Sequence, residues 1–435
     1  MVLDFALKAS RRHIAKYYLA LAIGYPREML LSVLVSIVVV AYIVESLLDH
    51  LNEGTARRPL DRKIAHLYDE KEREKSIAYS SEKTRFGFIS ATFSTVIMVF
   101  ALAYGWFAKL DNLVREQITN EIQISLIFIA ALGLISWLLN LPFALYGTFQ
   151  IEAKYGFNKT TLKTFFADAV KGSLVALVVG GVLLTALLWL YQELQSGFWI
   201  SAWLVVTAFS LFMFMFGTKL ILPLFNKLQP LPEGELKTEI QKYCASQGYA
   251  INRLFVMDGS KRSTKANAFF SGLGRSKTIV LFDTLIEKLS TKEIVAVLAH
   301  EIGHYKKKHT FSMFIFSLVQ SFGTFALLGW LLNYPELSTA LGAEQQSFHI
   351  SVLAFFILFT PLSILLGLIN NSWSRHNEFQ SDTFAAETYD VAPMRSALEK
   401  ISTDSLANLS PHPLYVAFNY THPTLLQRIK NVERK

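Results

Sequence analysis

Cysteine is almost absent from this chain of 435 residues, and charged side chains are scarce. The single cysteine, Cys244, excludes an internal disulfide framework and any metal site built from several thiolates. Asp, Glu, Lys and Arg make up 17% of the residues, against roughly 25% in soluble globular proteins. An ordinary cytosolic enzyme does not fit this composition. The 34 Phe, 17 Tyr and 7 Trp residues exclude a disordered chain.

Apolar residues are abundant instead, at 52% of the chain, and they gather in long runs. A membrane-spanning helix needs roughly 20 predominantly apolar residues, and seven runs qualify. They are Met29–Leu48, Phe86–Ala108, Ile122–Phe149, Gly172–Tyr191, Gly197–Thr218, Phe311–Tyr334 and Ile350–Trp373. The first contains Glu45 near its end, and the other six contain no charged residue. Buried core helices of a soluble protein do not explain so many long runs. The sequence therefore predicts a mostly α-helical, multi-pass integral membrane protein.

The net charge of +8 reflects how Lys and Arg are distributed around these spans. Segments 45–85 and 150–171 contain thirteen of them, whereas the loops on the opposite side contain only Lys109 and Arg115. Cytoplasmic loops are enriched in Lys and Arg, so this asymmetry predicts a cytoplasmic C-terminus; the basic N-terminal tail is a contrary signal. The membrane would be the inner membrane of a bacterium, or the endoplasmic reticulum or inner nuclear membrane of a eukaryote. We expect no nucleic-acid partner.

Two polar segments are long enough to fold outside the membrane. Residues 219–310 follow the fifth expected span, and residues 374–435 follow the seventh. Residues 311–373 cross the membrane twice between them, so both segments return to the same side and can form one discontinuous domain. Residues 1–218 then make an N-terminal membrane region with five helices. The charged segment 49–85 is expected to extend a helical hairpin into solvent.

The sharpest motif is the H-E-I-G-H sequence at residues 300–304. His300 and His304, at positions i and i+4, project from one helix face and can reach one tetrahedral zinc ion at ~2.0–2.1 Å. Glu301 would then lie beside the ion and accept a proton from its water, as in the H-E-x-x-H motif of zinc proteases. Zinc lowers the pKa of such a water and polarises the scissile carbonyl. Ser290 and Glu293 predict a capping box at the start of this helix.

Zinc needs a third protein ligand, and several residues are candidates. His309 lies nine positions beyond His300, which points it to the opposite face of a continuous helix. The other histidines considered are His376, His412 and His422. Glu378 is the better candidate, because a helix over Arg375–Tyr389 would put Glu378 and Asp382 on one face. Glu378 would bind the ion, and Asp382 would hydrogen-bond a ligand histidine.

These residues resemble the M48 metalloproteases, and most closely the Ste24-type CAAX prenyl endopeptidases. The resemblance covers nearly the whole chain, and Ser381 stands where the family commonly has alanine. The further motifs that carry it are Ile151-Glu152 with Tyr155–Lys159, Pro223–Lys227, Glu378–Asp382, and Thr421–Pro423 with Arg428. The resemblance implies seven transmembrane helices enclosing a water-filled chamber, capped by a zincin-like α+β catalytic domain. It also implies one zinc ion per chain, with Glu378 as the third ligand.

The resemblance also implies the substrate and the residues that contact it. Family members cut behind a prenylated cysteine and remove the last three residues, so the expected partners are a prenylated peptide or protein and membrane lipid. Lys265–Phe270 and Lys277–Phe282 are expected to form two short strands. The resemblance puts Asn267 and Ala268 on a strand edge that holds the substrate backbone. The alternative is a hairpin that only packs on the metal helix.

The resemblance assigns His422 and Arg428 to the site as well. They would stabilise the oxyanion of the tetrahedral intermediate, where a well-placed donor contributes ~3 kcal/mol. The structural alternative is a helix cap for His422 and a lipid-headgroup contact for Arg428.

Two rival functions remain open at the level of sequence. The first is a protease with the same chemistry that degrades misfolded or stalled membrane proteins. The second is a seven-span transporter or receptor with a structural metal. The second rival lacks support, because the spans lack the buried ionisable residues that mark substrate or ion pathways. The sequence therefore favours a membrane zinc endopeptidase that processes prenylated peptides.

Overall fold

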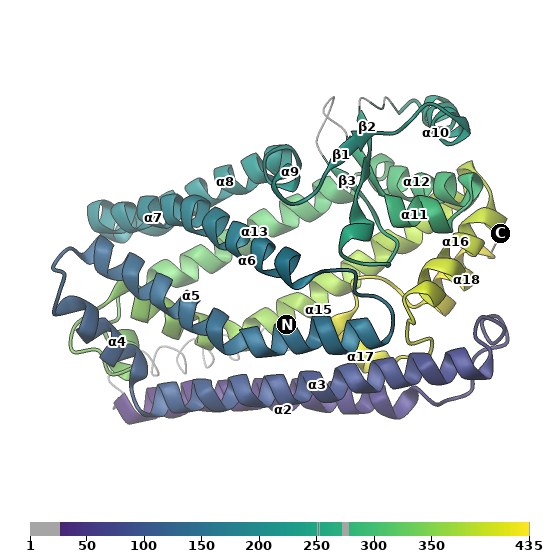
Figure 1. The fold of residues 1–435 in the computed structure, drawn as a ribbon. Coiled ribbons are helices and arrows are strands. Elements are labelled where there is room, and N and C mark those ends of the chain that lie inside the picture. The colour runs from purple at the N-terminus through teal and green to yellow at the C-terminus, as the bar shows by residue number, and fades with distance from the viewer. Residues whose placement is uncertain (1–26, 250, 252, 272–277, 435) are drawn as a thin grey trace, which may run out of the picture.

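The protein consists of a long bundle of membrane helices with an α+β part at one end (Figure 1). The structure is a computed structural model that describes residues 27–249, 251, 253–271 and 278–434. The basic N-terminal tail and most of the expected hairpin loop, 272–277, lie outside the described residues.

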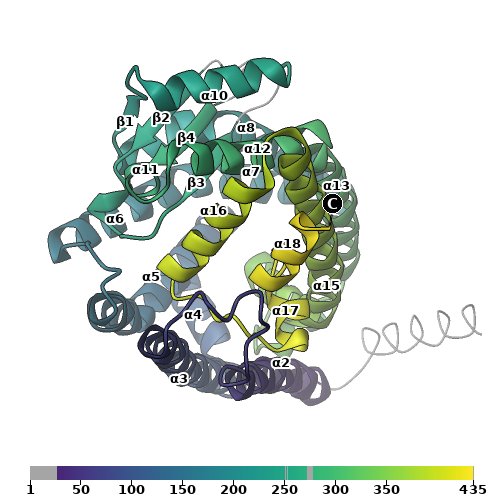
Figure 2. The same ribbon diagram turned by 90° about the vertical axis from the view of Figure 1, so that its right-hand side faces the viewer.

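Among the described residues, seven helical segments are long and apolar enough to cross a membrane, and each overlaps one of the expected spans. They are α2 (Arg27–Thr55), α3 (Glu70–Ala103), α5 (Glu121–Tyr146) with a π-helical turn (Gly147–Glu152), α6 (Leu162–Val175) joined to α7 (Gly181–Leu194), α8 (Phe198–Leu220) with α9 (Leu222–Phe225), α13 (His309–Leu331) and α15 (Phe348–Thr388). These helices stand in a ring, and the α+β part covers one end of it (Figure 2). The expected multi-pass, mostly α-helical fold is confirmed.

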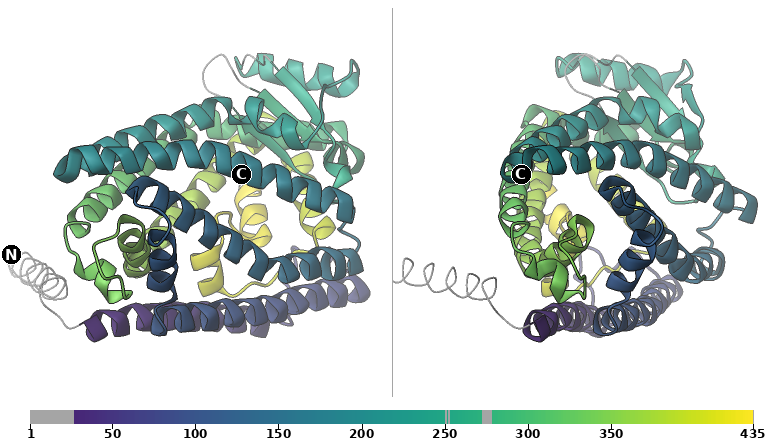
Figure 3. Two further views of the ribbon diagram at one scale, coloured as in Figure 1. Left: turned by 60° about the vertical axis from the view of Figure 1, so that its left-hand side comes forward. Right: turned by 90° about the vertical axis from the view of Figure 1, so that its left-hand side faces the viewer.

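Two short helices, α4 (Trp106–Arg115) and α14 (Glu336–Ala340), lie at the far end of the ring (Figure 3). Phe107 of α4, Leu337 of α14 and Leu341 just after α14 share an apolar core with Leu34 of α2. At the other end, α2 and α3 run alongside each other towards the α+β part (Figure 1). Asp69 caps α3 by accepting from the backbone N–H of Glu72. The charged hairpin extension expected from the sequence is therefore present.

In the part of the chain that the structure describes, the sheet of the α+β part has four short strands in the order β1-β2-β4-β3. They are β1 (Leu228–Pro230), β2 (Arg253–Met257), β3 (Ala268–Ser271) and β4 (Thr278–Phe282). β2 and β4 are parallel, and the two outer pairs are antiparallel. The two strands expected from the sequence correspond to β3 and β4, and β3 lies at the edge of the sheet.

Helices from both polar segments pack around this sheet. They are α10 (Glu235–Ser246), α11 (Asp283–Lys288), α12 (Thr291–Lys306), α16 (Val391–Asp404), α17 (Pro413–Asn419) and α18 (Leu425–Val432). One apolar core contains Ile240 and Val295 from the first segment and Ala385 and Ala397 from the second, all fully buried. The two polar segments therefore share one apolar core.

Helix α15 connects the membrane region to this domain without interruption. It contains the seventh span in its first half and the predicted acidic ligand near its end. The domain boundary expected between residues 373 and 374 falls inside this helix. The segment that carries Glu378 is therefore held rigidly at the end of a membrane helix.

Candidate metal centre

Helix α12 presents both motif histidines on one face. The expected capping box is present, because Ser290 Oγ accepts from the Glu293 N–H and the Glu293 carboxylate accepts from the Ser290 N–H at 2.8 Å. The helix then continues through the motif to Lys306. The Nε2 atoms of His300 and His304 lie 3.1 Å apart and point to the same place.

Glu378 joins the two histidines from helix α15. Its Oε2 lies 3.4 Å from His300 Nε2, and its Oε1 lies 3.2 Å from His304 Nε2. The helices approach closely at Gly303, where an added Cβ would lie 3.1 Å from the Cα of Ser381. The absence of a side chain at Gly303 therefore lets Glu378 reach the histidines.

These three residues fit a single divalent cation. Ligand atoms of a tetrahedral zinc ion at ~2.0–2.1 Å lie about 3.3 Å from one another. The three measured separations are 3.1, 3.2 and 3.4 Å. Glu378 Oε2 is buried and has no hydrogen-bond donor among the described residues, which is costly for a carboxylate unless a cation binds it. Within that part of the chain, this is the one group of three clustered His, Cys or acidic residues that could hold a metal ion.

Asp382 lies one turn beyond Glu378 and contacts the back of His300. Its Oδ1 is 2.8 Å from His300 Nδ1, and its side chain is fully buried. A hydrogen bond from Nδ1 leaves the Nε2 lone pair free for a metal. Burial alone would lower the pKa of His300, but the carboxylates of Asp382 and Glu378 beside it raise it to about 9. The surroundings thus favour positive charge at this point.

Arg428, on α18, binds Asp382 with two hydrogen bonds, at 2.6 and 2.9 Å. Burial alone would lower the pKa of Arg428, but the carboxylates of Asp382, Glu378 and Glu301 raise it above its ordinary value. The guanidinium therefore stays charged and balances the buried acids. Glu301 is half-buried on α12, next to the metal ligands.

His422 lies at the exposed rim of the site. Its Nε2 is 3.3 Å from Glu378 Oε1, and 61% of its side chain is accessible. Its Nδ1 lies 2.9 Å from the hydroxyl of Thr421. The structure thus brings His422 and Arg428 to the metal centre, although they come from a segment that follows the motif by more than a hundred residues.

The other candidate histidines have different positions. His412 caps α17 and accepts from the Leu414 N–H. His376 contacts the side chain of Gln380. The expectation that His309 faces away from the site is wrong, because its Nδ1 lies 3.1 Å from His304 Nδ1. Helix α12 ends at Lys306, and Lys308 has a φ of 59°, so the chain turns before α13 begins at His309.

That turn carries no clear signal in the sequence. Left-handed backbone usually occurs at glycine or asparagine, whereas here it occurs at a lysine. The sequence therefore predicts a helix that continues beyond the real end of α12. That prediction does not place His309 beside His304, where the structure has it.

The predicted substrate residues lie at the edge of the sheet. Asn267 is exposed, its Oδ1 accepts from the Ala268 N–H at 2.9 Å, and its carbonyl accepts from the Phe282 N–H. Ala268 pairs with Leu281 in β4. The other edge of β3 has no strand partner in the described part of the chain.

The motif at residues 151–159 holds the segment that leads into β3. The Glu152 carboxylate accepts from Lys265 Nζ at 2.8 Å and from the Tyr79 hydroxyl at 2.6 Å. Lys159 N–H donates to the Arg262 carbonyl, and Asn158 forms a β-bridge with Ser263. This motif therefore fixes the start of the predicted substrate strand against the membrane helices.

The motif at residues 223–227 meets the same segment through Arg262. The Arg262 guanidinium donates to both carboxylate oxygens of Asp168 on α6, at 2.8 and 2.9 Å. It also donates to Asn226 Oδ1 and to the Phe225 carbonyl. Arg262 thus joins α6, α9 and the catalytic sheet.

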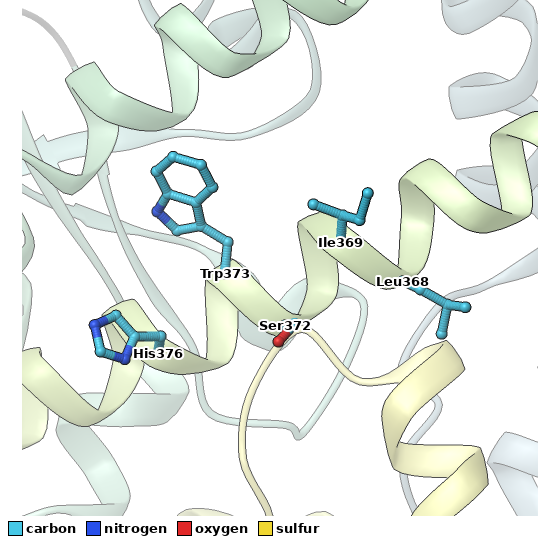
Figure 4. Close-up of a pocket in the computed structure, with 5 residues that line it drawn as sticks. All are labelled: Leu368, Ile369, Ser372, Trp373 and His376. Atoms are coloured by element: carbon cyan, nitrogen blue, oxygen red, sulfur yellow. The ribbon is translucent and has the colours of Figure 1, made fainter. Parts of the chain in front are cut away.

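A pocket of about 630 Å³ lies along α15 (Figure 4). It is lined by Leu368, Ile369, Ser372, Trp373 and His376. Trp373 precedes Glu378 by five residues, so it projects from a different side of the helix. The pocket therefore lies beside the metal centre and is separated from it by the helix itself.

Comparison with known proteins agrees with this architecture over both parts of the chain. Residues 49–227 match the family described as CAAX prenyl protease N-terminal, five membrane helices. Residues 230–435 match peptidase family M48.

Individual relatives and a solved structure extend the similarity to nearly the full length. A CAAX prenyl protease 1 homolog of Arabidopsis thaliana is 35% identical over 92% of this chain and 96% of its own. The homolog of Homo sapiens is 33% identical, over 84% of this chain and 87% of its own. The crystal structure of S. mikatae Ste24p aligns with a TM-score of 0.89 and 29% identity, covering 94% of this chain and 100% of that one.

Proposed function

This chain is a membrane metalloprotease that belongs to the Ste24-type CAAX prenyl proteases of peptidase family M48, and we propose that it is a zinc endopeptidase that removes the C-terminal tripeptide from prenylated CAAX-type peptides. One observation carries the chemistry. Two imidazole nitrogens and the carboxylate of Glu378 converge from two helices at the spacing of a tetrahedral zinc site, and one oxygen of that carboxylate is buried without a hydrogen-bond donor among the described residues.

We assign His300, His304 and Glu378 as the zinc ligands, one ion per chain. Zinc bound there would lower the pKa of a water molecule and polarise the scissile carbonyl. Glu301 accepts the proton of the attacking water and passes it to the leaving amine. Its place on α12, directly after His300, supports this role.

The remaining residues of the site have supporting roles. Asp382 orients His300, and Arg428 is held to Asp382 by two hydrogen bonds, so it stabilises the buried carboxylates. His422 is exposed at the rim and is the better donor for the oxyanion that develops on the substrate. The backbone of the substrate would pair with the edge of β3 at Asn267 and Ala268.

The proposal also includes a prenyl group on the substrate and the orientation of the protein in the membrane. The relatives that match over nearly their full length are named CAAX prenyl proteases, which supports a prenylated peptide as substrate. The excess of Lys and Arg in segments 45–85 and 150–171 supports a catalytic domain that faces the cytoplasm.

The test is cleavage of a farnesylated C-terminal peptide by the purified protein in detergent or liposomes. We expect cleavage behind the modified cysteine, its loss on chelation and its return when zinc is added. The same peptide without the lipid should be cut much more slowly. Equal turnover of the two peptides would contradict the CAAX assignment and favour a protease that degrades membrane proteins generally.

A further inference from the structure

A series of polar side chains in hydrogen-bonding contact extends from the candidate metal centre through His309. His309 Nδ1 lies 3.1 Å from Nδ1 of the ligand His304, on the side of that ring turned away from the metal position. His309 Nε2 lies 2.8 Å from Gln380 Oε1. Gln380 Nε2 lies 2.9 Å from His376 Nε2, on the next turn of α15. Four side chains from three helices are thus joined end to end.

Each contact in this series can be assigned one donor and one acceptor if all the hydrogen bonds run in the same direction. A neutral imidazole carries one N–H donor and one acceptor nitrogen. The Gln380 carbonyl can only accept, so His309 donates from Nε2 and its Nδ1 is an acceptor. His304 then donates from Nδ1, which leaves its Nε2 lone pair directed at the metal position. The Gln380 amide donates onward to His376.

Burial and backbone geometry hold His309 in this place. His309 is 5% exposed, and Ser381 beside it is fully buried. The Ser381 hydroxyl lies 3.4 Å from His309 Nδ1, so it is a second donor directed at the same acceptor. The left-handed turn at Lys308 brings His309 back towards α12, at a backbone conformation that non-glycine residues seldom adopt. Such conformations persist where the surrounding structure requires them.

We propose that His309 is a positioning residue for the metal ligand His304, and that Gln380 fixes the tautomer in which His309 can do this. The inference rests on the proposed zinc site. In that site the two ligand histidines are oriented by different chemistry. His300 donates to the carboxylate of Asp382, whereas His304 donates to a neutral imidazole. His309 therefore orients His304 without adding a further negative charge to a site that already contains three acids.

The test measures zinc affinity rather than activity. His309→Phe keeps a ring of similar size but removes the acceptor, and His309→Asn restores an acceptor oxygen near the position of Nδ1. Each purified protein is titrated with zinc in competition with a chromophoric chelator. Loss of a partner that orients a ligand histidine typically weakens metal binding by about 10–100-fold. We expect a loss in this range for His309→Phe and substantial recovery for His309→Asn.

Controls separate a positioning role from a general loss of structure. The thermal unfolding midpoints of the metal-free variants should match that of the metal-free parent protein. His66→Phe, at an exposed histidine in the segment between α2 and α3, should leave zinc affinity unchanged. If His309→Phe does not fold, Gln380→Met provides the second variant, because it frees His309 to adopt the wrong tautomer; its zinc affinity should also fall.

The outcomes distinguish this inference from the proposed function. Glu378→Gln tests the zinc site itself, and unchanged zinc binding in that variant would overturn the proposed function. If Glu378→Gln loses zinc while His309→Phe and Gln380→Met bind it as tightly as the parent, the metal site stands and the role of His309 is refuted. Equal losses in His309→Phe and His309→Asn would also refute it, because the acceptor would then make no difference.

Discussion

Glu301 is the residue on which the proposed proton transfer depends. Glu301→Gln removes the base but leaves His300, His304 and Glu378 in place, so zinc content should be unchanged. General base catalysis contributes about 10²–10⁴-fold, and we expect kcat to fall by that factor. Peptide cleavage assays together with metal analysis test this. Glu287→Gln, at an exposed acid on α11, is the matched control. Cleavage at the normal rate by Glu301→Gln would contradict the mechanism.

Arg428 is expected to matter for stability as well as for the site. Arg428→Met would leave the fully buried Asp382 without the two hydrogen bonds that the guanidinium donates to it. Removing one partner of a buried ion pair costs about 3–5 kcal/mol of unfolding free energy. Arg428→Lys keeps the charge but loses the paired geometry, so it should be intermediate. Thermal unfolding of the metal-free proteins measures this. The exposed Arg434→Met is the control, and an equally small effect at both positions would refute the prediction.

Residues close together in the sequence were the most predictable part of the site. His300, Glu301 and His304 share one helix, so their spacing alone predicts that both histidines face one ion. Glu378 is separated from them by two membrane crossings, and its assignment needed the family resemblance as well as helical phase. His309 is near in sequence but was misplaced, because no residue type marks the left-handed turn at Lys308.

At the scale of elements, the packing of α12 on α15 sets the distance between the ligands. A Cβ at Gly303 would lie 3.1 Å from the Cα of Ser381 and 3.2 Å from the side chain of Phe384. Gly303→Ala should therefore push the helices apart and lower zinc affinity. Gly323→Ala, in α13 with nothing within 4 Å, is the matched control and should bind zinc normally. Zinc competition measures both, and normal affinity in Gly303→Ala would show that the contact can relax.

The contact between α12 and α16 should stabilise the fold less at acid pH. Burial alone would raise the pKa of Glu293, but hydrogen bonds from Lys400, Ser396 and Ser290 lower it to about 2. A lowered pKa means that the carboxylate stabilises the fold above its ordinary pKa of 4.5 and that this stabilisation is lost as pH falls towards 2. Each pKa unit corresponds to about 1.4 kcal/mol.

Glu293→Gln therefore should reduce the unfolding free energy most at neutral pH. The difference from the parent protein should shrink as pH falls from 4.5 towards 2, measured by unfolding at a series of pH values. The exposed Glu287→Gln should show no such trend. A difference that does not change with pH would mean that Glu293 titrates normally in the folded protein.

Long apolar runs made the membrane helices predictable, because each must cover the thickness of a bilayer. The sheet was predicted only in part. β3 and β4 were found, whereas β1 has three residues and β2 follows an irregular segment, so neither gives a clear periodic signal. The sequence also does not predict that α15 is one continuous helix, because its polar second half has the composition of a separate segment that follows an apolar span.

At the scale of the whole molecule, polar contacts join the membrane ring to the catalytic domain, in addition to the continuous helix α15. Arg262 is the centre of one such group, with Asp168, Asn226 and the Phe225 carbonyl as acceptors. These contacts give a structural role to the motifs at 151–159 and 223–227, which contain no candidate catalytic or metal-binding residue. They position the segment before β3 relative to the helices from which a lipid-bearing substrate would arrive.

Asp168→Asn should loosen this connection without disturbing the metal. A hydrogen bond to a charged group is worth about 1.5–3 kcal/mol, and the variant removes the charge from two of them. We expect faster hydrogen exchange in residues 258–268 and unchanged zinc content. Glu116→Gln, which removes the charge of an exposed acid just after α4, is the control. Unaltered exchange in 258–268 would show that the connection does not depend on Asp168.

The central claim is that one zinc ion lies between His300, His304 and Glu378. X-ray diffraction from crystals of the purified protein, collected on both sides of the zinc absorption edge, tests it most directly. The account predicts one anomalous peak per chain, ~2.0–2.1 Å from Nε2 of each histidine and at bonding distance from a Glu378 oxygen. A peak elsewhere, or Glu378 turned away from the two imidazoles in a zinc-loaded crystal, would contradict it.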